Sequence, residues 1–158
     1  MKAIIMYTSK YGCTEKAAYL LKTQLGEETE VVNLMHAKEP SLDRYDTVIL
    51  GGSIYFGKIQ KEMTEYILKN QTELSDMRLG LFICAGAKRE QAVQELKTSF
   101  PEELFNKAVA KEIFGDEIYA QKLSLMDKFV LRMIKGKDLT GSGLSKETIE
   151  KFALVMKI

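Results

Sequence analysis

Short apolar runs alternate with amphipathic segments along this chain, and the alternation constrains the fold more than any other feature. Each run is long enough for a strand but too short for a helix. The predicted strands cover residues 2–7, 29–33, 47–50, 79–85 and 108–114. Continuous apolar strands are typical of parallel sheets that are covered by helices on both faces. The pattern therefore predicts an α/β protein, a three-layer α/β/α sandwich with a five-stranded parallel sheet.

Segments with apolar residues at helical spacing separate these strands. The predicted helices cover 14–25, 61–69, 90–97, a short stretch after Pro101, 125–134 and the C-terminal segment that Ser145 caps. Gly26 is predicted to end the first helix. Residues 115–144 form a connection much longer than the handful of residues a compact α/β unit needs. We therefore expect a single domain, 1–158, with an insertion at about 115–144 before the last helix.

Composition excludes several classes of function. No apolar run approaches the ~18 residues of a membrane span, and the N-terminus lacks the pattern of a signal peptide. A cytoplasmic location is therefore expected, with membrane association possible only through the insertion. Two cysteines and one histidine, His36, provide neither a disulfide framework nor a zinc cluster. No catalytic side chain and no metal ligand is predicted, and a net charge of +1 argues against a nucleic-acid partner.

The loop after the first predicted strand has the composition of an anion site. Hydroxyl groups and backbone N–H groups at the start of a helix bind anions. The loop runs Thr8-Ser9-Lys10-Tyr11-Gly12-Cys13-Thr14 and contains neither GxxxxGK[ST] nor GxGxxG. Two interpretations remain: a small phosphate monoester bound through hydroxyls, or a turn in which Ser9 or Thr14 only caps the helix.

Two segments resemble flavodoxins. YTSKYGCTEKAA resembles the flavodoxin loop that wraps the FMN phosphate, and GGSIYFGKIQKEM resembles the loop after the third strand. In the second loop Ile54 replaces the Trp that stacks on the flavin, with Tyr55 and Phe56 beside it. The resemblance implies FMN as cofactor and a sheet of order 2-1-3-4-5. It implies cofactor-binding roles for Thr8, Ser9, Lys10, Tyr11, Gly12, Cys13, Thr14, Ser53, Ile54, Tyr55, Phe56, Gly57, Ala85, Gly86, Ala87 and Lys88.

Within the flavodoxin-like proteins, the chain is similar to the bacterial menaquinone-dependent protoporphyrinogen IX dehydrogenase family. That family has a Gly-Ala-Ser-Ile-x-Tyr-Gly loop, which Gly51, Ser53, Ile54 and Gly57 match. Its insertion carries a Tyr-Asp-Arg-Phe-Met-Ile-Lys type of segment, which residues 126–132 resemble. The stretch 86–100 is shorter and more mixed in charge than its counterpart in the family. The resemblance implies oxidation of protoporphyrinogen and reduction of a quinone, in heme biosynthesis.

The insertion carries a local excess of positive charge. Residues 121–137 contain five basic side chains and one acidic one, a net charge of +4. Apolar residues at helical spacing in 125–134 either pack in the core or contact a membrane, a quinone or a tetrapyrrole. The second interpretation predicts peripheral membrane contact through 123–137.

Three functions remain open for such a chain. The first is an FMN oxidoreductase whose partner is a quinone or a redox protein. The second is an electron-transfer flavodoxin without a small-molecule substrate, and the third is a binding module that has lost FMN. Because electron carriers of this kind are typically strongly acidic, the near-neutral charge of the chain favours the enzyme.

Overall fold

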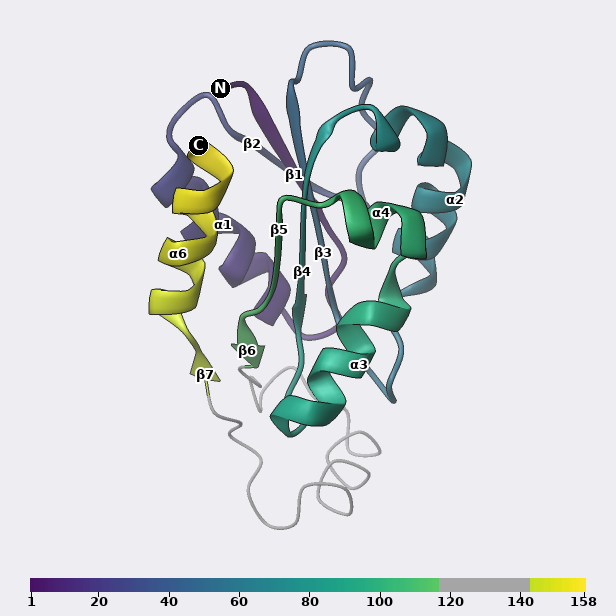
Figure 1. The fold of residues 1–158 in the computed structure, drawn as a ribbon, viewed down its shortest axis with the longest axis vertical. Helices are drawn as coiled ribbons and strands as arrows, with labels where there is room; N and C mark the ends of the chain where they lie inside the picture. The colour runs from purple at the N-terminus through teal and green to yellow at the C-terminus, as the bar shows by residue number, and fades with distance from the viewer. Residues whose placement is uncertain (117–142) are drawn as a thin grey trace.

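A five-stranded parallel sheet forms the centre of the protein (Figure 1). The computed structural model describes residues 1–116 and 143–158. The strands are β1 (Ala3–Tyr7), β2 (Glu30–Asn33), β3 (Thr47–Ser53), β4 (Arg78–Cys84) and β5 (Ala110–Ile113). Their order is β2-β1-β3-β4-β5, and every neighbouring pair is parallel. This arrangement confirms the predicted fold class and strand order.

Helices cover both faces of the sheet, as Figure 1 shows. On one face lie α1 (Cys13–Leu25) and α6 (Lys146–Lys157), which pack against each other. On the other face lie α2 (Lys61–Ser75), α3 (Arg89–Ser99) and α4 (Glu102–Lys107). The central strands β1, β3 and β4 are therefore buried along nearly their whole length, and this explains their apolar sequences. The edge strands β2 and β5 are mostly half-buried and carry charged residues.

Local signals set the end of α1 and the start of α6. Gly26 ends α1 with a φ of 114°, a conformation that glycine adopts without a steric penalty. The Ser145 hydroxyl caps α6 by accepting a hydrogen bond from the Thr148 N–H at 3.2 Å. Helix α2 extends to Ser75, beyond the predicted end at 69, because it continues through a kink at Asn70. The helical spacing of apolar residues is interrupted at this kink, so the sequence pattern predicted a helix end that is too early.

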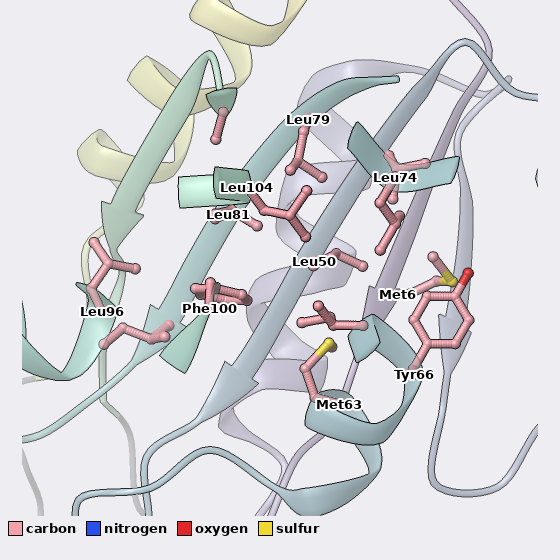
Figure 2. Close-up of a cluster of buried hydrophobic side chains, with 14 of the residues drawn as sticks. Met6, Leu50, Met63, Tyr66, Leu74, Leu79, Leu81, Leu96, Phe100 and Leu104 are labelled. Atoms are coloured by element: carbon pink, nitrogen blue, oxygen red, sulfur yellow. The ribbon is translucent and has the colours of Figure 1, made fainter. Parts of the chain in front are cut away.

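Two apolar clusters fill the spaces between the sheet and its helices. Figure 2 shows the first, in which side chains of α2, α3 and α4 such as Met63 and Leu104 meet Leu50 and Leu81 of the sheet. The second joins the sheet to α1 and α6 and contains the stacked rings of Phe82 and Phe114, 4.6 Å apart. These clusters hold the sheet, and with it the loops at the strand ends, in fixed positions.

A two-stranded antiparallel ribbon joins the two ends of the predicted insertion. It consists of β6 (Gly115–Asp116) and β7 (Gly143–Leu144) and was not predicted. The segment 121–137, its helix at 125–134 and the membrane contact predicted for 123–137 lie outside the described residues. In the described part of the chain, no helix has the length and apolarity needed to cross a membrane.

Candidate functional site

Three loops meet at the carboxyl edge of the sheet. Strand pairing sets Tyr7 of β1 beside Gly51 of β3, and Ser53 of β3 beside Cys84 of β4. The loops that follow these strands therefore start at one edge, where ligands bind in open parallel sheets. The sequence-based site residues fall in these loops or at their borders, with Ser53 at the end of β3 and Cys13 and Thr14 at the start of α1. The topology therefore brings the three predicted segments together.

The loop after β1 leads directly into the N-terminus of α1. Gly12 occupies the N-cap position with a φ of 94°, and no side chain caps the helix. The Gly12 N–H donates to the Ser9 Oγ at 3.0 Å, and the Gly12 carbonyl accepts the first helical hydrogen bond, from the Lys16 N–H, at 3.1 Å. A helix start that lacks a side-chain cap, preceded by a glycine, has the geometry of an anion-binding site.

The Gln60 side chain fastens the first loop to the second. Its Oε1 accepts hydrogen bonds from the Thr8 hydroxyl at 2.7 Å and from the Ser53 N–H at 3.1 Å. Its Nε2 donates to the Ser53 carbonyl at 3.0 Å. The hydroxyls of Thr14 and Ser53 add a further link, 2.5 Å long. The buried hydroxyls of Thr8 and Thr14 thus bind the neighbouring loop rather than face outward.

Gln60 belongs to the site although it was not among the predicted cofactor-binding residues. Its signal was present in the sequence, because the Gly-x-Ile-Gln pattern that ends at this residue matches the flavodoxin loop after the third strand. The structure adds what the pattern could not supply, namely that the amide is a clamp between two loops.

The second loop folds into a tight aromatic turn. Tyr55 and Lys58 exchange two backbone hydrogen bonds, of 2.9 and 3.2 Å, around Phe56 and Gly57. Both central residues have positive φ, 52° and 76°, as in a type I′ turn. A bulky residue in this conformation is rare, and the Phe56 side chain is also 57% exposed. We call residues 55–58 the aromatic turn.

The aromatic turn touches the first loop through its rings. The Tyr55 ring lies edge-on to Tyr11 at 6.1 Å and to Phe56 at 4.5 Å. The Lys10 ammonium lies 4.7 Å from the Tyr55 ring centroid. Ile54, at the position of the flavodoxin Trp, instead packs against the core. Tyr55 and Phe56 are therefore better placed than Ile54 to contact a planar ligand.

The third loop is partly closed. Ala85 is buried, and its N–H donates to the Gly115 carbonyl at 3.0 Å. Gly86 and Lys88 are exposed, Ala87 is half-buried, and Lys88 lies at the N-cap of α3. The contact with Gly115 places the start of the predicted insertion directly beside this loop.

Both cysteines lie in the apolar cluster between the sheet, α1 and α6. Cys13, a predicted cofactor-binding residue, is only 3% exposed, so its side chain belongs to the core. Its contribution to an anion site is limited to the backbone at the start of α1. Within 1–116 and 143–158, no group of acidic, cysteine or histidine side chains could hold a metal ion.

Glu95 of α3 is a site residue that the sequence pattern did not reveal. Its side chain is 7% exposed, and a Cβ added at Gly57 would lie 3.9 Å from its Oε2. Burial raises the pKa of Glu95, and a hydrogen bond from the Gln91 side chain opposes this effect. Glu95 lies three residues after Ala92 and one before Leu96, and both of these residues are buried. This spacing could have predicted that the glutamate lies on the apolar face of α3.

An open cavity of about 240 Å³ lies beside the aromatic turn. It is lined by Lys10, Met35, Tyr55 and residues 58–62. The cavity therefore borders the first two loops and the start of α2. Two residues of the aromatic turn, Tyr55 and Lys58, are thus part of the cavity lining.

Comparison with curated proteins gives matches to part of the chain. It is 31% identical over 80 residues to protoporphyrinogen IX dehydrogenase [quinone] of Escherichia coli, a match that covers 49% of this chain and 44% of that protein. The chain thus spans less than half of this relative. An uncharacterized protein of Methanocaldococcus jannaschii is 29% identical over 119 residues, 73% of each chain.

Solved structures share the fold along the full length of the chain. An archaeal flavodoxin has a TM-score of 0.56 and 16% identity, with complete coverage of both chains. The flavodoxin of Fusobacterium nucleatum bound to flavin mononucleotide has a TM-score of 0.52 and 13% identity, over 99% of this chain and 98% of that one. A family model described as "Flavodoxin domain" matches residues 4–142. The chain therefore belongs to the flavodoxin domain family.

Proposed function

We propose that this protein is an FMN-binding oxidoreductase. The observation that carries the proposal is the first loop, where a helix start without a side-chain cap follows Gly12 and Ser9. Helix starts of this kind bind phosphate groups. The aromatic turn lies on the same edge, so a phosphate and a planar ring joined to it would meet both features.

The residues present fit FMN in two respects. The α1 N-terminus and the Ser9 hydroxyl would hold the phosphate, and Gly12 allows the backbone to approach it. Tyr55 and Phe56 offer aromatic surface to the flavin ring, and residues 86–88 follow β4 at the same edge of the sheet. Bound FMN supplies the electron-transfer chemistry, and the protein supplies its position and electrostatic surroundings.

Reconstitution of the protein with FMN and with riboflavin tests this proposal. We expect one FMN per chain, measured by quenching of flavin fluorescence, and weaker binding of riboflavin because it lacks the phosphate. Equal affinity for the two flavins would contradict the role of the first loop. Failure of both flavins to bind would overturn the proposed function as a whole.

Within this function, we propose that the substrate is protoporphyrinogen IX and that electrons pass to a quinone. Support comes from the partial match to the Escherichia coli enzyme of that name. The Gly115 carbonyl, at the start of the predicted insertion, accepts a hydrogen bond from the Ala85 N–H of the third loop. This contact places the start of the insertion beside the loop, and it also supports a substrate site next to the cofactor. Turnover of protoporphyrinogen with a menaquinone analogue would support this substrate, and FMN-loaded protein without turnover would contradict it.

An electron carrier without its own substrate is the second candidate. Its support is the similarity in fold to flavodoxins over nearly the whole chain. A carrier would exchange electrons with a redox protein and would leave protoporphyrinogen unchanged. Stopped-flow measurement of both reactions with one preparation of FMN-loaded protein distinguishes the two candidates.

A further inference from the structure

A buried carboxyl group lies directly behind the aromatic turn. Glu95 comes from α3, yet its Oε2 would lie 3.9 Å from a Cβ added at Gly57. The Glu95 Oε1 is buried and has no hydrogen-bond partner among the described residues. The hydrogen bond from Gln91 compensates the carboxylate only in part, and burial of the other oxygen without a partner disfavours the ionised form. Helix α3 thus carries an ionisable side chain at a buried position, where an apolar or neutral side chain would be more stable.

The charged groups nearest to α3 have partners of their own or lie in solvent. On the elements packed against α3, Glu112 of β5 pairs with Arg89 at 3.5 Å, and Lys111 lies over the Phe105 ring. On α4, Lys107 bonds to the Ser75 carbonyl, whereas Glu102 and Glu103 are exposed.

Other charged groups lie on the elements that flank the site. Lys58 of the aromatic turn is exposed, as are Lys88, Glu90 and Lys97 at the start and end of α3. Glu62 of α2 is half-buried, with a buried Oε2 that has no partner among the described residues. Burial, rather than a neighbouring charge, is the main reason why the pKa of Glu95 is raised.

We propose that Glu95 is a positioning residue of the redox site, which takes up a proton when the flavin against the aromatic turn gains negative charge. This inference rests on the proposed binding of FMN. Electrons reach the cofactor from an external reductant. A proton moves from a solvent hydronium ion to a carboxylate oxygen of Glu95, so that an O–H bond of hydronium breaks, a carboxyl O–H bond forms and water is left. Protonated Glu95 no longer repels the added negative charge, so its titration couples the redox potential to pH.

The first measurement is the FMN midpoint potential of the wild type and of Glu95→Gln between about pH 5 and pH 8, with dithionite as reductant. Glutamine keeps the shape of the side chain but cannot ionise. We expect the potential of Glu95→Gln to be higher than wild type at pH 8 and to approach wild type at the acidic end. Parallel curves at all pH values would overturn the inference.

Glu90→Gln is the matched control. It makes the same chemical change on the same helix, but Glu90 is exposed whereas Glu95 is buried. Its potential should follow the wild type at every pH. An equal shift in Glu90→Gln would show a general effect of net charge, and this result would also overturn the proposal.

The second measurement needs no cofactor. Because the pKa of Glu95 is raised in the folded state, the native protein binds more protons than the unfolded chain between the two pKa values. Its stability therefore falls as pH rises through that window, which begins near the ordinary glutamate pKa of about 4.3. We expect the urea midpoint of apo wild type to fall over this range, and that of apo Glu95→Gln to fall less.

The two measurements separate this inference from the function on which it rests. If the protein binds no flavin, the proposed function fails, whereas the urea experiment still tests the raised pKa of Glu95. If FMN binds and only the urea midpoints differ, Glu95 has a purely structural effect and its redox role is wrong. A pH-dependent difference in both measurements supports the proposal.

Discussion

The loop after β1 and the aromatic turn after β3 face the same edge of the sheet, but they are built in opposite ways. The first loop relies on backbone geometry, with Gly12 at the start of α1 and Ser9 bonded to it. The aromatic turn relies on exposed side chains, and it holds Phe56 in a backbone conformation that bulky residues rarely adopt. Behind this turn lies the carboxyl of Glu95.

This difference assigns separate tasks to the two regions. Backbone N–H groups at a helix start recognise an anion and determine how tightly a phosphate binds. Aromatic surface and a titratable group beside a flavin ring affect its electronic state instead. We therefore expect changes in the first loop to alter affinity, and changes around the aromatic turn to alter potential and local stability. Gln60 joins the two regions and should affect both.

The largest expected effect is a loss of affinity on changing the first loop. Ser9→Ala combined with Thr14→Val removes two hydroxyls, one bonded to Gly12 and the other to Ser53. A hydrogen bond from Ser9 to the phosphate would contribute roughly 1.5–3 kcal/mol, and loss of the Thr14 hydroxyl also removes the link that fixes Ser53 beside the loop. We therefore expect FMN affinity to fall roughly 100-fold. Fluorescence titration checks this.

Thr23→Val provides the control for that variant, because it makes the same change on the exposed face of α1. Its FMN affinity should equal that of the wild type. Riboflavin binding should change little in either variant. If the double variant bound FMN as tightly as the wild type, the first loop would not be the phosphate site, and the two regions would not have separate tasks.

The next effect concerns the clamp between the two regions. Gln60→Leu leaves the buried Thr8 hydroxyl and the Ser53 N–H without their acceptor. Each unpaired buried group costs about 1–3 kcal/mol, so we expect the free energy of unfolding to fall by about 2–4 kcal/mol in urea titrations. Gln24→Leu, at an exposed position of α1, should leave it nearly unchanged. Similar losses in both variants would show that the clamp has no special role.

A smaller effect of opposite sign is expected at the tip of the aromatic turn. Phe56→Gly relieves a left-handed backbone conformation with a φ of 52°, which costs about 1–3 kcal/mol for a residue other than glycine. After the entropy cost of glycine, about 0.5–1 kcal/mol, apo protein should gain about 1 kcal/mol of stability while losing FMN affinity. Lys58→Gly, where φ is not positive, should be destabilising. A destabilised Phe56→Gly variant would contradict strain in the turn.

The smallest effect belongs to the contact between the two regions. Lys10→Met removes an ammonium 4.7 Å from the centre of the Tyr55 ring. Because this side chain is exposed, the loss of stability should stay below about 1 kcal/mol. Lys97→Met on the exposed surface of α3 is the comparison variant. A loss of several kcal/mol in Lys10→Met alone would mean that the rings and the ammonium act as one structural unit.

Local patterns in the sequence were sufficient for the strands and helices, and the resemblance to flavodoxins supplied the strand order. Apolar runs and helical spacing predicted the five strands, because burial on both faces requires apolar residues along the central strands. Gly26 and Ser145 marked helix ends through their own backbone and side-chain chemistry. Parallel strands bring their carboxyl ends to one edge, so strand order alone was enough to place the three loops together.

Tertiary structure decided how the site residues use their side chains. Thr14 meets Ser53 across 39 positions of sequence, and Thr8 meets Gln60 across 52. Such contacts depend on strand register and helix packing, which periodicity alone does not contain. The position of the Glu95 carboxyl beside Gly57 arises in the same way, from the packing of α3 against the sheet. The sequence by itself determined the elements and their loops, whereas the clamp, the strained turn and the buried carboxyl exist only because distant segments pack together.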